Sequence, residues 1–320
     1  MKELQKFDPT IWQGRKDEED GLDGIRMHQI IQEYQEAEAY KQVLLGFGSD
    51  EGVKRNKGRE GAAEAPNEIR KALANLPVHF NPIEKSIADA GNVLCIEGDL
   101  ERARLLQIDK VGEILSKNQL PIVIGGGHET SLGNYLALAK HYQNIAIINI
   151  DAHFDLRSPS PKTSSGTPFY EMHQFCEEEN RIFDYSVLGV QENGNTMALF
   201  KRAEVWKVNY HLADEIHFNF EQMLSNLRLK LTSADAVYLS LDMDVFDVAY
   251  APGVSAPSIN GLTPFQVKYL VKLIAKSGKL RLFDLVEVNP SLDRDNQTSK
   301  LAAHMICLLY TSDAADDSLR

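Results

Sequence analysis

The chain has 320 residues, 43% of them apolar, which is enough to bury one large core. Its 46 acidic and 34 basic side chains leave a net charge of −12, which argues against binding to nucleic acid or to an anionic membrane. The polar N-terminus and the lack of a long apolar run predict neither a signal segment nor a membrane span. Three widely spaced cysteines form no CxxC pair, which favours a reduced cytoplasm over a disulfide framework.

Short apolar runs alternate with helical patterns along almost the whole chain. Eight β-strands are predicted, at residues 42–48, 86–93, 120–126, 144–150, 185–190, 205–210, 236–242 and 280–288. Helical patterns lie between or after them, at residues 66–76, 100–118, 218–231 and 263–278. Thr263 followed by Pro264 is typical of a helix start. The alternation predicts an α/β fold with a mostly parallel sheet that helices cover on both faces.

No internal repeat or low-complexity linker divides the chain, so we predict one domain over residues 1–306. The segment KLAAHMI (300–306) is typical of a final helix. The sequence CLLYTSDAADDSLR (307–320) loses this pattern and resembles a translated sequencing adaptor. We therefore expect residues 307–320 to be a non-native or disordered tail, and they are left out of the fold prediction.

Four polar clusters follow directly after predicted strands. They are GGGHE (125–129), DAHFD (151–155), DMDVFD (242–247) and EVNP (287–290). In open α/β sheets, ligands bind beyond the carboxyl ends of the strands. The four clusters therefore predict one shared site.

The spacing within these clusters indicates a metal centre. Asp151, His153 and Asp155 alternate, as do Asp242 and Asp244, so each set points to one face if its strand continues. The six candidate ligands are His128, Asp151, His153, Asp155, Asp242 and Asp244. Four carboxylates and two neutral imidazoles carry a charge of −4, which two divalent cations would balance. Mixed oxygen and imidazole ligands favour Mn²⁺ over a thiolate-seeking metal.

Each motif also has a simpler interpretation. Asp-x-Asp after a strand occurs in calcium loops and nucleotide-sugar sites, and GGGHE is compatible with a turn that caps a helix. DAHFD is more informative, because buried alternating acids are costly without a counter-charge. The three motifs in one chain favour a metal site over three unrelated structural features.

The motifs GGGHE, DAHFD, SLDMDVFD and DLVEVNP, in this order, resemble those of the ureohydrolases, which include arginases, agmatinases and formimidoylglutamases. The resemblance extends from about residue 12 to residue 306. It implies a three-layer αβα fold with an eight-stranded, mostly parallel sheet. It also implies two Mn²⁺ ions per subunit, held by the six residues above and bridged by water or hydroxide. Relatives of this kind imply a homo-oligomer, a trimer or a hexamer.

The same resemblance assigns catalytic roles. Glu287 of EVNP matches the glutamate that holds the cationic amidine or guanidine of the substrate. A metal-activated hydroxide would attack the amidine carbon. Asp155 and His153, beside the ions, are assigned to catalysis together with Glu287. A solvated acid at the end of a strand is the alternative interpretation of Glu287.

Three further stretches, IWQGRKD (11–17), residues 46–70 and SSGTPF (164–169), resemble formimidoylglutamases. Ser165 stands where agmatinases carry a histidine that shuttles protons, which argues against that chemistry. Arg157 follows the DAHFD segment and suits a substrate carboxylate, because its guanidinium binds carboxylates through two parallel hydrogen bonds. Ser165, Asn56, Arg55 and Arg59 are further candidates for substrate binding, the two arginines for the second carboxylate of the substrate. A solvated loop or an internal salt bridge is the alternative for each of these two arginines.

These observations favour a cytoplasmic Mn²⁺-dependent hydrolase of N-formimino-L-glutamate, an amidine with two carboxylates, in histidine degradation. The first alternative is an agmatinase or guanidino-acid ureohydrolase that releases urea. A second is a non-catalytic metal-binding scaffold. A third is a two-metal phosphoesterase, against which the chain shows no GxxxxGK[ST] phosphate loop.

Overall fold

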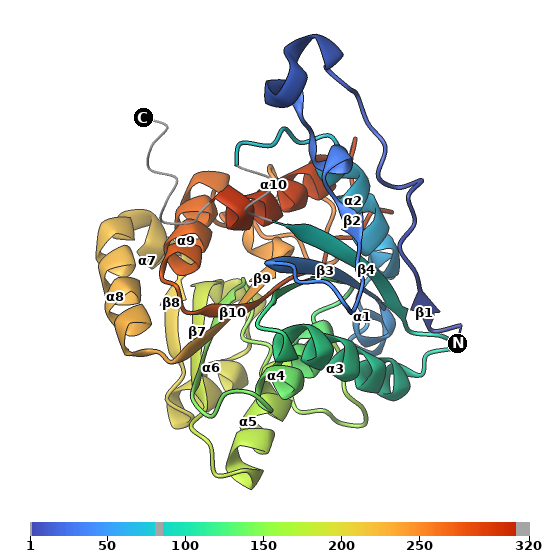
Figure 1. Cartoon of the computed structure of the whole chain (residues 1–320). Coiled ribbons are helices and arrows are strands. Elements are labelled where there is room, and N and C mark those ends of the chain that lie inside the picture. Colours follow the sequence, from blue (N-terminus) through green and yellow to red (C-terminus); the bar gives the residue numbers. More distant parts are fainter. Residues whose placement is uncertain (1, 81–85, 312–320) are drawn as a thin grey trace.

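The computed structural model describes residues 2–80 and 86–311 (Figure 1). Within these residues, ten strands form one sheet, in the order β1-β4-β3-β5-β10-β9-β6-β7-β8, with β2 paired to β4. The strands are β1 (Leu4–Gln5), β2 (Gln32–Glu33), β3 (Gln42–Gly48), β4 (Ile87–Leu94), β5 (Leu120–Gly125), β6 (Ile145–Ile150), β7 (Asp184–Val190), β8 (Asn209–Leu212), β9 (Ala236–Asp242) and β10 (Leu280–Val286). The run from β4 to β8 contains eight strands, all parallel, and β1 is antiparallel to β4 at the edge. The predicted mostly parallel sheet is confirmed; its parallel run has the predicted eight strands, and β1 and β2 extend the sheet to ten.

One strand was predicted too early in the chain. The prediction at residues 205–210 overlaps β8 at only two residues, because Val205 is the last residue of helix α6 (Met197–Val205). Val205 and Trp206 have the side chains that are typical of strands, but Val205 is 76% exposed at the end of this helix. Tertiary packing therefore overrides local propensity here.

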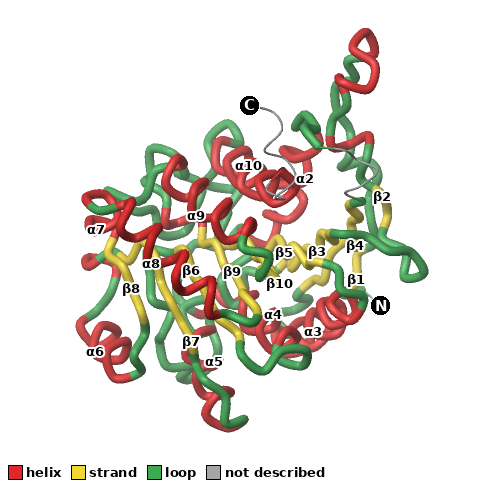
Figure 2. The backbone as a smooth tube through the Cα atoms, turned by 60° about the vertical axis from the view of Figure 1, so that its left-hand side comes forward, coloured by secondary structure: helices red, strands yellow, loops and turns green. Residues whose placement is uncertain are grey.

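Helices cover both faces of the sheet, so the molecule has three layers (Figure 2). The helices are α1 (Glu51–Arg55), α2 (Ala65–Ala74), α3 (Leu100–Ser116), α4 (Thr130–Leu138), α5 (Pro168–Glu178), α6 (Met197–Val205), α7 (Ala213–Phe218), α8 (Phe220–Ser233), α9 (Pro264–Lys276) and α10 (Gln297–Thr311). The α2, α8, α9 and α10 side chains share one core cluster, whereas those of α3, α4, α5 and α6 share the other. Successive strand residues alternate between the two clusters: Ile122 and Ile124 enter the first, and Val123 the second.

The predicted helices agree with the structure, with one break. The pattern at 218–231 joins two helices, since Phe218 ends α7 and Phe220 begins α8. Thr263 caps α9 as predicted, because its Oγ accepts a hydrogen bond from the backbone N–H of Gln266 at 3.3 Å. None of the helices in the described part of the chain is long and apolar enough to cross a bilayer.

The predicted domain boundary at residue 306 falls inside helix α10, which continues to Thr311. Leu308, Leu309 and Tyr310 are buried in the core cluster with residues of α2 and α9. Residues 307–311 therefore belong to the fold, which corrects the expected start of the tail. The end of the helix was missed because the short segment 307–310 was judged by its resemblance to an adaptor and not by its apolar side chains. The remainder of the predicted tail, 312–320, lies outside the described residues.

Candidate metal centre and substrate pocket

The candidate site lies at the carboxyl ends of four neighbouring strands in the middle of the sheet, β5, β10, β9 and β6, which are labelled in Figure 2. His128 follows β5, Asp151 follows β6, Asp242 ends β9 and Glu287 follows β10. The turn after β5 must be glycine, because a Cβ atom on Gly126 would lie 1.7 Å from the backbone oxygen of Ser49. The predicted convergence of four strand ends is therefore present.

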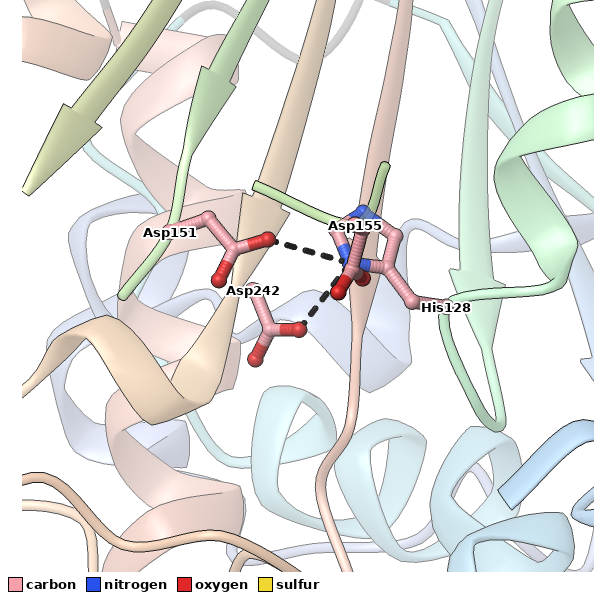
Figure 3. A group of neighbouring side chains, drawn as sticks. All are labelled: His128, Asp151, Asp155 and Asp242. Carbon is pink, nitrogen blue, oxygen red and sulfur yellow. Dashed lines mark ion pairs between the residues drawn. The ribbon is translucent and has the colours of Figure 1, made fainter. Parts of the chain in front are cut away.

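His128 is the centre of the first group of ligand atoms (Figure 3). Its Nδ1 atom lies 2.9 Å from Asp155 Oδ2, 3.0 Å from Asp242 Oδ2 and 3.3 Å from Asp151 Oδ2. These four residues each offer one ligand atom, and the four atoms lie within 4.8 Å of one another. Without a metal ion, a proton on His128 would be needed to offset the charge of the three carboxylates around it. One bound cation could take the place of that proton.

A second group adjoins the first through Asp151. His153 Nδ1 lies 3.0 Å from Asp244 Oδ2 and 3.6 Å from Asp151 Oδ1. The ligand atoms of this group also lie within 4.8 Å of one another. Asp151 thus offers one carboxylate oxygen to each group, so the structure brings the six predicted ligands together in two adjoining groups, each of which could hold a cation.

The electrostatics of the cluster fit bound cations. Burial raises the pKa of Asp242 well above its usual range, and the charges of Asp244 and Asp151 raise it further. Burial alone would lower the pKa of His128, but its three carboxylate neighbours outweigh burial and raise it well above the usual range. Two buried atoms, His128 Nδ1 and Asp244 Oδ1, have no hydrogen-bond partner among the described residues. Cations bound between the carboxylates would offset the repulsion among these side chains. They would also give His128 Nδ1 and Asp244 Oδ1 a partner.

Side chains behind the cluster hold the candidate ligands in place. His128 Nε2 lies 2.9 Å from Ser240 Oγ, which in turn donates a hydrogen bond of 2.6 Å to Asp284 Oδ1. The amide of Asn149 donates to Asp151 Oδ2 at 2.8 Å. Such contacts fix the orientation of a ligand and tune its affinity for metal.

Sequence reasoning missed these supporting residues. Ser240 and Asp284 are paired neighbours on β9 and β10, and both side chains are buried. The signal that could have found them is a polar residue inside an otherwise apolar strand. Asn195 was also missed: its amide donates to the backbone oxygen of Ala152 at 2.9 Å and accepts from the N–H of Phe154 at 3.0 Å, which braces the DAHFD loop.

Glu287 lies beside the metal ligands. Its Oε1 atom accepts a hydrogen bond of 2.8 Å from the backbone N–H of His128. Burial, followed by the charge of Glu129, raises the pKa of Glu287 to about 8. The backbone φ is +67° at Glu287 and +48° at Asp155, a region that costs energy for a residue with a Cβ atom. Strain of this kind gathers at functional sites, where the surrounding structure holds it in place.

Glu129, which sequence analysis treated only as part of a helix start, is fully buried behind Glu287. Its Oε1 atom accepts hydrogen bonds from Ser49 Oγ at 2.8 Å and from the N–H of Gly52 at 2.9 Å. Gly52 belongs to α1, which is followed by Asn56, a residue that lines a cavity over the candidate metal ligands. Glu129 therefore joins the metal-ligand loop to one wall of this cavity.

A cavity of about 290 Å³ opens over the metal ligands. Its lining includes His153, Asp155, Asp242, Asp244 and Glu287. Three of the predicted substrate-binding residues, Asn56, Arg157 and Ser165, line it as well. The Asn56 amide donates to Ser165 Oγ at 3.3 Å, and Arg157 is exposed.

The other two predicted substrate-binding residues lie elsewhere. The guanidinium of Arg55 forms ion pairs with Glu51 at 2.9 Å and Glu101 at 3.2 Å. The guanidinium of Arg59 donates to the backbone oxygens of Val254 and Ser255, both at 2.9 Å. Neither arginine lines the cavity over the metal ligands. Contact between these arginines and a substrate stays a prediction, and it is opposed by the ion pairs and hydrogen bonds that already engage both guanidinium groups.

No residue of the N-terminal motif IWQGRKD lines the cavity over the candidate metal ligands. Trp12 is buried, and its indole N–H donates to Asp89 Oδ2 at 2.9 Å. Asp89 lies on strand β4 near the edge of the sheet, and Trp12 does not line the cavity over the metal ligands. This motif anchors the N-terminal segment to the core.

Comparison with known proteins defines the class. A sequence model of the arginase family matches residues 40–311, and the chain belongs to this family. Within it, the chain is similar to a formimidoylglutamase from Aeromonas hydrophila, with 42% identity over 313 residues that cover 95% of this chain and 98% of the relative. The crystal structure of formimidoylglutamase from Bacillus subtilis matches with a TM-score of 0.84 and 25% identity, over 96% of each chain. Trypanosoma cruzi formiminoglutamase with Mn²⁺ matches with a TM-score of 0.79 and 25% identity, over 89% of this chain and 97% of the other.

Proposed function

We propose that this chain is a Mn²⁺-dependent hydrolase that converts N-formimino-L-glutamate and water into L-glutamate and formamide. The observation that carries the proposal is the shared cavity, in which the two candidate cation sites, Glu287 and Arg157 face one space. The similarity to formimidoylglutamases over nearly the full length supports the same reaction. We further propose that the protein acts as a homo-oligomer, a trimer or hexamer, in the cytoplasm, in line with the small number and wide spacing of its cysteines.

The metals would be held by the two groups that share Asp151. His128, Asp155 and Asp242 complete one group, and His153 and Asp244 complete the other. When bound, two Mn²⁺ ions lower the pKa of water from about 15.7 toward about 7 and polarise the substrate. The oxygen and imidazole ligands suit this metal.

The protein's own side chains would bind and orient the amidine. Oε1 of Glu287 is engaged by the backbone of His128, so its other oxygen is the one available to the amidinium. This charge-assisted hydrogen bond would keep the carboxylate of Glu287 ionised and present the amidine carbon to the metal ligands. The bond between this carbon and the amino nitrogen of glutamate breaks, the carbon leaves as formamide, and the nitrogen leaves as the amine of L-glutamate.

Arg157 would select the substrate. It lines the cavity, it is exposed, and no carboxylate of the described chain lies within ion-pair distance of it. A substrate carboxylate would be its partner, whereas agmatine, which carries only positive charge, would be repelled. Ser165 and Asn56, joined by a hydrogen bond, would form a polar wall beside Arg157.

The test is turnover by the Mn²⁺-loaded protein on N-formimino-L-glutamate, agmatine, L-arginine and guanidinobutyrate, with formamide and urea measured. We expect formamide from the first compound alone. Arg157→Ala should raise KM roughly tenfold or more, because a charged hydrogen bond is lost. Arg228→Ala, an exposed arginine on α8, is the matched control and should leave KM unchanged. Urea from a guanidino compound would overturn the substrate assignment, and metal binding without turnover would favour a scaffold.

A further inference from the structure

A second cavity adjoins the cavity over the metal ligands. It has a volume of about 600 Å³, and Asn56, Arg157 and Leu199 line both cavities. Ser158, Ser164 and Thr196 contribute hydroxyl groups to its walls. We call this second cavity the vestibule. Because Arg157 lies at the junction, a ligand held there can extend from the metal ligands into the vestibule.

The vestibule is lined by positive charge and by no carboxylate. The cations are Arg55, Arg157, Lys162 and Arg202. The charge of Arg55 is balanced by its ion pairs with Glu51 and Glu101. In the part of the chain that the structure describes, Arg157, Lys162 and Arg202 form no ion pair with any carboxylate. Three uncompensated cations therefore face one cavity in a chain whose net charge is −12.

Arg202 is the most constrained of these cations. Its guanidinium donates to the backbone oxygen of Leu156 and lies 5.1 Å from the ring centre of Tyr170 and 5.6 Å from that of Trp206. The side chain is partly buried, and a charge removed from water without a partner is costly. A cation held in this way is preorganised for an anion, because little side-chain entropy is left to lose on binding.

We propose that the vestibule is an anion subsite that binds the side-chain carboxylate of the substrate through Lys162 and Arg202. Arg157 at the junction then binds the carboxylate next to the amidine nitrogen. The two methylene groups of the glutamate side chain lie between these two contacts. This inference rests on the proposed function and deepens it, since it assigns the second carboxylate to a different pair of cations from Arg55 and Arg59, whose guanidinium groups already have partners.

The test compares two substrates of nearly the same shape, N-formimino-L-glutamate and N-formimino-L-glutamine, in which an amide replaces the side-chain carboxylate. The wild-type Mn²⁺ enzyme should favour the acid. Lys162→Gln should lower the ratio of the kcat/KM value for the acid to that for the amide roughly tenfold, because only the acid loses a contact between opposite charges. Arg202→Gln should have the same effect. Lys201→Gln is the control, an exposed lysine that precedes Arg202 on α6 and does not line the vestibule.

The outcomes separate this inference from the proposed function. If the wild-type enzyme hydrolyses the acid but Lys162→Gln and Arg202→Gln keep its substrate ratio, the vestibule does not bind the side-chain carboxylate. If the wild-type enzyme hydrolyses neither compound, the proposed function fails. In that case, calorimetry with glutarate as the probe still tests whether the vestibule binds a carboxylate. Weaker glutarate binding by the Lys162→Gln, Arg202→Gln double variant than by the wild type supports the anion subsite, and equal binding overturns it.

Discussion

The chain contains two sets of largely buried charged side chains, at different places along one sheet. Near the sheet edge, the guanidinium of Arg70 lies 2.8 Å from Asp89 Oδ1 and donates to Asn92 at 2.5 Å. Trp12 donates to the other oxygen of Asp89. In the middle of the sheet, four carboxylates surround two imidazoles at the ends of the strands. The first set is buried, and so is the second except for the partly exposed side chains of His153 and Asp155. Both sets include an ion pair or a close contact between opposite charges.

The two sets differ in charge balance. One guanidinium and one carboxylate cancel in the Arg70 set, and neighbouring polar groups satisfy Asp89. The metal cluster carries four carboxylates against two side chains that are neutral when they act as metal ligands. A buried set that cancels its own charge stabilises the fold, whereas a set with excess charge needs a partner from outside. Charge balance, rather than burial, therefore distinguishes the structural set from the functional one.

The largest expected effect comes from Asp151, which belongs to both cation sites. Asp151→Asn removes an oxygen ligand from each group, so we expect the metal content to fall well below two ions per chain. Turnover should drop by about a thousandfold or more, a loss of about 4 kcal/mol in transition-state stabilisation. Metal analysis and kinetics on the purified variant measure both quantities. Two retained ions with full turnover would contradict the shared role of this carboxylate.

Arg70→Met should have the opposite pattern. It leaves Asp89 charged and buried without its ion-pair partner, so we expect the free energy of unfolding to fall by about 3–5 kcal/mol. The metal content and the kcat of the folded fraction should not change, because Arg70 does not line the cavity over the metal ligands. Denaturant unfolding of the Mn²⁺-loaded variant, together with metal analysis, measures this. A loss of metal without a loss of stability would remove the distinction between the two sets.

Ser240→Ala tests the support behind His128. Without this hydroxyl, the imidazole loses its hydrogen bond at Nε2 and its link to Asp284. Mn²⁺ affinity should fall roughly 10–100-fold, which a titration with a competing chelator detects. Ser131→Ala is a matched control: its hydroxyl contacts Asp284 but no candidate ligand, so its effect on affinity should be smaller. Equal effects of the two variants would contradict a direct role for Ser240.

The smallest expected effect is a change in how stability depends on pH. In the metal-free protein, the folded-state pKa values of Glu287 (about 8), Asp242 and His128 are raised above their ordinary values, so the folded state binds more protons than the unfolded state. Their stabilisation is present below the unfolded pKa and is lost as the pH rises through the folded pKa. Asp151, whose pKa is lowered, opposes this trend.

Metal-free protein should therefore lose stability between about pH 5 and about pH 8. The Mn²⁺-loaded protein should show the reverse trend, because metal binding releases protons and strengthens as the ligands deprotonate. Thermal unfolding with and without chelator, across this range, compares the two. Identical pH profiles would indicate that the cluster does not exchange protons for metal.

Sequence alone predicted the regular elements because apolar periodicity is a local property. It placed seven of the eight strands within two residues of their observed ends, and it located the site from polar residues at strand ends. It placed β8 too early, because Val205 and Trp206 have strand propensity but end a helix. It also ended the fold at residue 306, whereas burial of Leu308, Leu309 and Tyr310 extends α10 to Thr311.

The sequence by itself determined the candidate ligands, since Asp-x-His-x-Asp and Asp-x-Asp after buried strands carry a charge that only cations balance. Only the tertiary structure decided which cations are available to a substrate. Arg55 is paired with acids of α1 and α3, whereas Arg157 and Arg202 have no acidic partner in the described chain. The physical reason is that a strand end fixes a side chain through local geometry, whereas the partner of a long, flexible side chain depends on segments that are distant in sequence and meet only in the folded protein.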